Sequence, residues 1–196
     1  MLERIKTVLK DNGVDGSDIL MKIAVYRNYD SKVDLLYQES SWETDAKHLK
    51  GFLGKVKPIG GWGKEAMEVG LLRATEEIDG GLSQIFIIGD MPHNFASDIV
   101  AKQNGEHGRE YWDKKLPGIQ EAPVYVEQLK AKGIPIHTLY LQENAKECFT
   151  GISSSTGGES YFLDVQDQKS ADMLVEVVNV QILKSMKNPD LLASYE

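Results

Sequence analysis

The most informative stretch for the fold class is Gln84-Ile85-Phe86-Ile87-Ile88-Gly89-Asp90-Met91-Pro92-His93-Asn94. Its apolar part is unbroken as far as Gly89, which is typical of a strand buried on both faces in the parallel sheet of an α/β protein. Ligand sites in such sheets lie beyond the carboxyl ends of the strands, where Asp90 falls. An acidic residue after a strand also commonly caps the next loop or helix, and this alternative stays open.

Composition narrows the class of protein. With 196 residues, 41% of them hydrophobic, the chain can bury one ordinary core, and a second domain is not expected. The net charge of -8 and the absence of a basic cluster argue against a nucleic-acid partner. The one cysteine, Cys148, cannot form an intramolecular disulfide. No stretch approaches the roughly 20 apolar residues of a membrane span, so a cytoplasmic protein is expected.

The rest of the chain alternates expected helices with expected strands. The helices are 2–9, 44–56 with Thr44 as its cap, 67–78, a segment from Pro123 up to Gly133, 145–154 and 170–186. The further strands are 19–26, 35–39, 134–141 and 160–165, and residues 94–120 are expected to form a long surface loop with at most one short helix. This order predicts an α/β fold, a doubly wound, mostly parallel sheet of about five strands with helices on both faces. One domain is expected over residues 1–187, with a C-terminal tail at 188–196.

Two short motifs come at the ends of expected strands, Tyr26-Arg27-Asn28-Tyr29-Asp30 and Gly89-Asp90-Met91-Pro92-His93, and a third, Gly60-Gly61 with Glu65, precedes the expected helix 67–78. Together they resemble the turns of the von Willebrand factor type A (vWA) domain, above all the version that accompanies alpha-type protein kinases. The element order from Leu2 to Met186 is similar to that Rossmann-like fold. The resemblance implies a protein-interaction module that is not an enzyme.

The resemblance also bears on metal binding. Members that bind metal take their main ligands from an Asp-x-Ser-x-Ser turn after the first strand. That strand and its turn would precede the helix that begins at Leu2, and the sequence does not contain them. The glycine loop here carries Trp62, which has no oxygen to offer a hard cation. Asp90 remains as a ligand, with Glu65 as a displaced helper, whereas Mg²⁺ prefers about six oxygens. The resemblance therefore implies a degenerate or absent metal-ion-dependent adhesion site, with Mg²⁺ as the one cation expected there and no other cofactor.

A protein partner is expected to bind the loops at the strand ends instead. Its expected contacts are Tyr29, Asp30, Gly61, Trp62, His93 and Asn94. His93 is more often, in such a loop, a histidine bonded to the backbone. Trp42, Trp62 and Trp112 fall in or beside expected loops, where aromatic side chains either anchor a partner or fold back over the core.

The missing first strand lies in the middle of the sheet in this family. Its absence predicts two strands with unpaired edges, through which another polypeptide or a second copy of the chain could associate. Two alternatives stay open. One is a metal-dependent, phosphohydrolase-like enzyme that uses Asp90 as a ligand or general base. The other is the interaction-domain fragment of an alpha-kinase-type protein.

Overall fold

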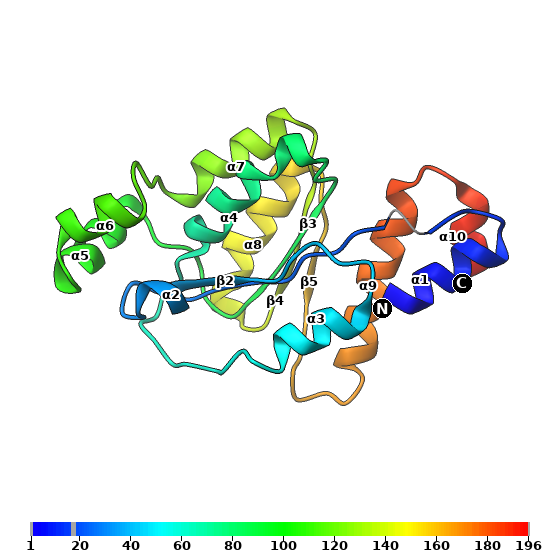
Figure 1. Ribbon diagram of the computed structural model, residues 1–196, viewed down its shortest axis with the longest axis horizontal. Coiled ribbons are helices and arrows are strands. Elements are labelled where there is room, and N and C mark those ends of the chain that lie inside the picture. Colours follow the sequence, from blue (N-terminus) through cyan, green and yellow to red (C-terminus); the bar gives the residue numbers. More distant parts are fainter. Residues whose placement is uncertain (1, 17–18, 196) are drawn as a thin grey trace. The chain divides into compact units, whose positions relative to one another are not determined.

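The computed structural model describes residues 2–16 and 19–195, and it shows a mixed α/β chain (Figure 1). Contacts divide the chain into two compact units, and the single domain expected over 1–187 stays a prediction. One unit comprises Met1–Ile23, Glu39–Pro58 and Leu163–Glu196, and the other comprises Ala24–Gln38 and Ile59–Phe162. None of the described helices is long and apolar enough to cross a membrane.

A three-stranded parallel sheet forms the centre of the second unit. Its order is β3 (Ile85–Gly89), β4 (Ile136–Tyr140) and β5 (Ser160–Phe162). Three helices pack with it: α8 (Glu143–Thr156) lies against β4 and β5, and α7 (Ala122–Ala131) packs on both α8 and α4 (Met67–Glu76). The expected parallel sheet with surrounding helices is confirmed at this level.

The helices and the sheet enclose one apolar cluster. It includes Leu71, Ile87, Leu129, Ile136 and Phe149, all of them buried. One turn makes this packing close: a Cβ on Gly158 would lie 2.0 Å from the carbonyl oxygen of Ile136, so only glycine fits between α8 and β5.

The remaining two strands form a separate sheet. β1 (Ala24–Tyr26) pairs with β2 (Tyr37–Glu39), which follows the short helix α2 (Val33–Leu36). The chain runs antiparallel here, since the amide of Arg27 donates to the carbonyl of Leu36 at 2.9 Å. The five expected strands are therefore present among the described residues, in two sheets rather than one.

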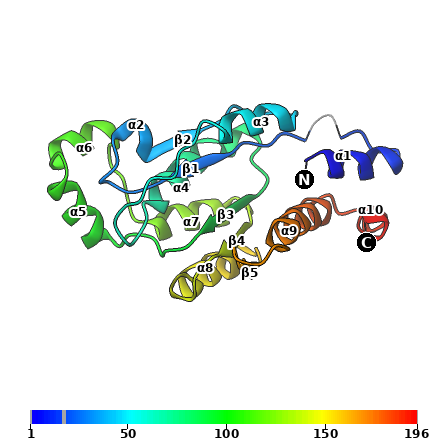
Figure 2. The same ribbon diagram turned by 90° about the horizontal axis from the view of Figure 1, so that it is seen from below.

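Two expectations about burial and loops are wrong. β3 is not buried on both faces, because the side chain of Ile88 is 42% exposed. The segment 94–120 is not a long loop: it forms α5 (Ala96–Gly105) and α6 (Arg109–Lys115), which lie at the end of the unit away from β5 (Figure 2). These helices are polar and therefore lack an apolar stripe, but Trp112 is fully buried in a second cluster with Tyr29, Leu36 and Val69.

The first unit is mainly helical. α1 (Leu2–Asp11) packs on α9 (Ser170–Ser185) and on α10 (Pro189–Tyr195), which forms where a C-terminal tail was expected. The buried face of α1 consists of Leu2, Ile5 and Leu9, as its spacing predicts. A further helix, α3 (Ala46–Leu53), is capped by Asp45 rather than Thr44, because the Asp45 carboxylate accepts from the amide of Lys47 at 2.7 Å. The short 3-10 helix η1 (Ile78–Gly80) belongs to the second unit and leads toward β3.

Candidate functional site

Three loops of the second unit are joined just beyond the carboxyl ends of β1 and β3. The amide of Glu65 donates to the carbonyl of Pro92 at 3.1 Å, and the amide of Asn94 donates to the carbonyl of Glu65 at 3.2 Å. On the other side, the amide of Ala66 donates to the carbonyl of Arg27 at 2.7 Å. One short segment thus connects the loop after β1 to the loop after β3.

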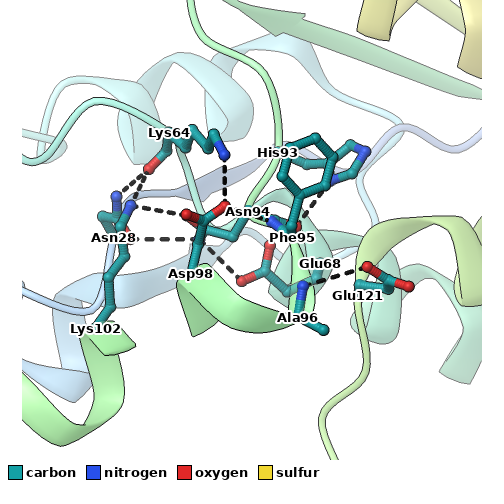
Figure 3. A network of polar contacts seen from close by, with 10 residues as sticks. All are labelled: Asn28, Lys64, Glu68, His93, Asn94, Phe95, Ala96, Asp98, Lys102 and Glu121. Atoms are coloured by element: carbon teal, nitrogen blue, oxygen red, sulfur yellow. Dashed lines mark hydrogen bonds and ion pairs between the residues drawn. The ribbon is translucent and has the colours of Figure 1, made fainter. Parts of the chain in front are cut away.

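The carboxylate of Glu68 lies at the centre of this junction (Figure 3). Glu68 is in the first turn of α4 and is fully buried. Its Oε1 accepts from the hydroxyl of Tyr29 at 2.9 Å and from Nδ2 of Asn94 at 3.1 Å, whereas its Oε2 has no hydrogen-bond partner among the described residues. Burial raises the pKa of Glu68 to about 7, although both donors act in the opposite direction.

Lys102 of α5 reaches into the same network. Its Nζ donates to Oδ1 of Asn94 at 2.7 Å and to the carbonyl of Lys64 at 2.6 Å. Asn28 donates through Nδ2 to that same carbonyl of Lys64, and its Oδ1 lies 3.5 Å from Nδ2 of Asn94. The side chain of Lys64 turns the other way and pairs with Asp98 at 2.6 Å. Each of the three loops is therefore fixed by side chains of the others (Figure 3).

Tyr29 belongs to the second apolar cluster, whose other members pack around its ring. Its ring meets that of Trp112 edge to face, with centroids 5.1 Å apart, and Trp112 donates through Nε1 to the carbonyl of Glu106 at 2.7 Å. Burial and the neighbouring Glu68 raise the pKa of Tyr29, so its hydroxyl stays protonated and donates to the carboxylate. The α5–α6 segment, expected as a loop, thus supports the site.

Three further carboxylates gather near the loops. Burial, then Asp90 and Asp30, raise the pKa of Glu65 to about 7, against the opposing effects of Lys102 and Arg27. Oδ2 of Asp30 accepts from the amide of Trp62 at 3.0 Å, while its Oδ1 is buried without a partner among the described residues. Within the described part of the chain, no group of three or more His, Cys, Asp or Glu side chains is arranged to hold a metal ion.

The residues expected to contact a partner divide into two sets. Gly61 and Trp62 are exposed, and Asp30 is half-buried beside them. Tyr29 and Asn94 are fully buried, so they support the loops from within rather than forming the surface. His93 is nearly buried, and its Nδ1 donates to the carbonyl of Asn94 at 2.8 Å. It is therefore a loop histidine that is hydrogen-bonded to the backbone, which was the alternative to partner contact.

An exposed aromatic and cationic surface lies over the network. Phe95 is 53% exposed and Trp62 is 37% exposed. Nζ of Lys64 lies 4.0 Å from the ring centroid of Phe95, and Nζ of Lys102 lies 5.8 Å from that of Trp62. We call these four residues the loop surface.

Sequence reasoning missed the centre of the site. Glu68, Lys102 and Phe95 were not among the expected site residues. Glu68 carried a usable signal, because it is a carboxylate between Met67 and Val69 at the start of an apolar helix. Lys102 carried none, since its segment was expected to be a loop.

No protein-family model and no curated protein matches the sequence. Among solved structures, the chain is similar to an uncharacterized membrane-spanning protein from Vibrio fischeri, at 13% identity and a TM-score of 0.33 over 92% of this chain and 84% of that one. A likeness this low carries no argument about fold or function. The cytoplasmic location expected from the sequence has no support from this comparison, in which the other protein is named as membrane-spanning, and that expectation is not retained.

Proposed function

We propose that this chain is a vWA-like protein-interaction module that binds a partner through the loop surface. The observation that carries the proposal is the network around Glu68, which fixes three loops and holds Trp62 and Phe95 on a frame that is ordered before binding. A preorganised surface saves the free energy that mobile loops would lose on binding. Exposed aromatic side chains beside cations are common anchors at such interfaces.

The finer fold, a doubly wound sheet that lacks its first strand, belongs to the same proposal. A sheet of that kind would leave a ribbon of two strands on one side of the absent strand and three parallel strands on the other. The order β1-β2 and β3-β4-β5 supports this interpretation. The motifs after β1 and β3 that resemble the vWA turns lie together in the network, which supports it further.

The decisive experiment compares substitutions on and away from the loop surface. Trp62→Ala and Phe95→Ala remove exposed rings, whereas Val124→Ala removes a side chain of similar exposure, 38%, from α7. The proteins that the native chain captures are identified first. Mass spectrometry then quantifies how much of each of them every variant captures. We expect at least a tenfold loss of one specific partner with both ring variants and no loss with Val124→Ala. Equal capture by all four proteins would overturn the proposal.

A second candidate function rests on the raised pKa of Glu65. A carboxylate with a pKa of about 7 beside Asp90 is suited to act as a general base, as in the phosphohydrolase-like alternative. Glu65→Gln and Asp90→Asn separate the two functions. An enzyme would lose at least a hundredfold of its Mg²⁺-dependent turnover of a phosphomonoester such as p-nitrophenyl phosphate, whereas an interaction module shows no such turnover in the native chain.

A further inference from the structure

β3 has a free edge on the side away from β4. The amide of Ile85 donates to Pro135 at 3.0 Å, and the amide of Leu141 donates to the carbonyl of Gly89 at 2.9 Å. The odd-numbered residues of β3 therefore face β4, and alternation directs the backbone groups of Phe86 and Ile88 to the opposite side. No described residue forms a backbone hydrogen bond with either of them.

β1 has a matching free edge. The amide of Arg27 donates to Leu36, and the amide of Ser40 donates to the carbonyl of Ile23 at 2.8 Å, so the odd-numbered residues face β2. The backbone groups of Ala24 and Tyr26 point the other way and have no backbone partner among the described residues.

The segment at Glu65 indicates how far apart these edges are. It bonds on one side to the chain just after β1 and on the other to the chain just after β3, and its bridge to His93 is parallel. Adjacent strands in a sheet are about 4.8 Å apart. The Glu65 segment is paired on both sides, so the chains that follow β1 and β3 are separated by the width of one strand, and the edges of β1 and β3 leave room for one strand between them. The hydroxyl of Tyr26 lies 3.2 Å from where a Cβ of Gly89 would be, so the side chain of Tyr26 reaches from β1 to β3 at this end.

We propose that β1 and β3 receive one extended segment of a partner protein, which pairs parallel to β3 and joins the two sheets. This rests on the proposed interaction function and names the form of the partner. Addition of a strand to an open edge is an established mode of peptide recognition. The parallel direction follows from the bridge between Glu65 and His93, which continues the same alignment beyond the strand ends.

The surroundings define the chemistry of that segment. Ile88 and Ala24 are exposed and uncharged, so β-branched or small apolar residues fit between the edges. Asp30, Glu65 and Asp90 gather at the carboxyl end, where burial and mutual repulsion raise the pKa of Glu65. A Lys or Arg at the end of the segment would relieve that repulsion. A second copy fits poorly, because each copy has a net charge of -8.

The test uses a synthetic peptide, acetyl-Thr-Val-Ile-Val-Val-Lys-amide with a fluorescent label, and three peptide controls. One control ends in Glu instead of Lys, and the other two are methylated on alternate sets of backbone amides. Fluorescence anisotropy measures binding, and hydrogen exchange reports which amides become protected. We expect at least tenfold weaker binding for the Glu peptide and for both methylated peptides, because a segment between two edges uses both sets of amides. Exchange should slow at Phe86 and Ile88 of β3 and at Ala24 and Tyr26 of β1. Weaker binding of one methylated peptide only would show that a single edge is used and would overturn the joining of the two sheets.

Substitutions in the chain separate this inference from the proposed function. Ile88→Pro removes an outward amide and leaves the bonds of Ile87 and Gly89 to β4, so peptide binding should fall at least tenfold, whereas Val124→Ala on α7 should leave it unchanged. If Ile88→Pro does not fold, the methylated peptides still decide. No binding, or protection confined to other strands, would overturn the inference while leaving the loop surface intact. Concentration-dependent dimerisation that protects Phe86 and Ile88 without peptide would overturn it in favour of a second copy.

Discussion

Two buried polar clusters in the same unit are satisfied to different degrees. Around Thr138 in β4, the hydroxyl lies 2.7 Å from Oγ of Ser153 and 2.9 Å from Oγ of Ser160, which ties the central strand to α8 and β5. Around Glu68, one carboxylate oxygen has two donors, and the other has none among the described residues. The first cluster is neutral, whereas the second carries a charge whose burial raises its pKa.

The neutral cluster strengthens the fold, whereas the charged network weakens it. Hydroxyl groups can both donate and accept, so they satisfy one another without a net charge in the core. A partly satisfied carboxylate keeps part of its desolvation cost, and perturbed groups of this kind occur often at functional sites. The Thr138 cluster therefore holds the sheet, and the Glu68 network holds the loops at a cost in stability.

The largest effect is expected from removing the support under the Glu68 network. Trp112→Ala deletes a fully buried ring that contacts Tyr29, and such truncations cost about 3–5 kcal/mol of unfolding free energy. Denaturant unfolding measures the loss, and hydrogen exchange should show faster opening around Tyr29 than around Thr138. Trp62→Ala, at a ring that is 37% exposed, is the control and should cost less than about 1 kcal/mol. Equal costs for the two would contradict the burial of Trp112.

The next effect is a change in pH dependence. The pKa of Glu68 is raised from 4.5 when unfolded to about 7 when folded, so the folded state binds the proton more tightly. The contribution of Glu68 to stability is therefore greatest below pH 4.5, falls as the pH rises toward 7, and is absent above it. The difference amounts to as much as about 3 kcal/mol at 1.4 kcal/mol per pKa unit.

Glu68→Gln keeps an acceptor for Tyr29 and Asn94 but cannot ionise. Melting temperatures between pH 4.5 and 8 should fall less steeply for this variant than for the native chain. Part of the slope remains, because the pKa of Glu65 is raised in the same direction. Thr138→Val is the matched control and should keep the native slope. If Glu68→Gln also keeps it, Glu68 does not titrate in this range.

The same contrast shows what the sequence could predict. The spacing of Leu2, Ile5 and Leu9 was sufficient for α1, because an apolar stripe records which face of a helix is buried. The position of the loops at the strand ends was also predictable, since β4 and the end of β3 are marked by apolar runs. These features depend on local patterns only.

Pairing and charge burial were not predictable in this way. The residues of β3 are as apolar as those of a central strand, yet Ile88 is exposed because β3 lies at a sheet edge, which composition does not encode. Likewise, Glu68 and Lys102 are joined through Asn94 only because α4 and α5 approach the same loops. Their role depends on tertiary contacts such as Tyr29 with Glu68 and Lys102 with Lys64, which join residues 39 and 38 positions apart.

A smaller effect is expected from the neutral cluster. Thr138→Val removes the hydroxyl and keeps the shape, so Ser160 loses a partner, whereas Ser153 still donates to the carbonyl of Phe149 at 3.1 Å. The expected cost is about 1–2 kcal/mol, and it should not depend on pH between 5 and 8. Thr150→Val removes an exposed hydroxyl of α8 that lies 3.4 Å from Oγ of the same Ser160, and it should cost less than Thr138→Val because solvent can replace that contact. A pH-dependent loss for Thr138→Val would contradict the assignment of this cluster as uncharged.

The smallest effect on stability is expected at the rim of the Glu68 network, where charge is exposed to solvent. Burial alone would raise the pKa of Asp98, but hydrogen bonds from Lys64 and from the amide of Phe95 outweigh it, so the pKa is lowered. Lys64→Met should therefore cost less than about 1 kcal/mol at neutral pH, and still less in high salt. The contribution of the ion pair is present above the unfolded pKa of Asp98 and disappears as the pH falls through its lowered folded value. Because Lys64 also covers the ring of Phe95, the same variant should change the free energy of partner binding more than the free energy of unfolding. Equal changes in the two free energies would show that the ion pair only stabilises the fold.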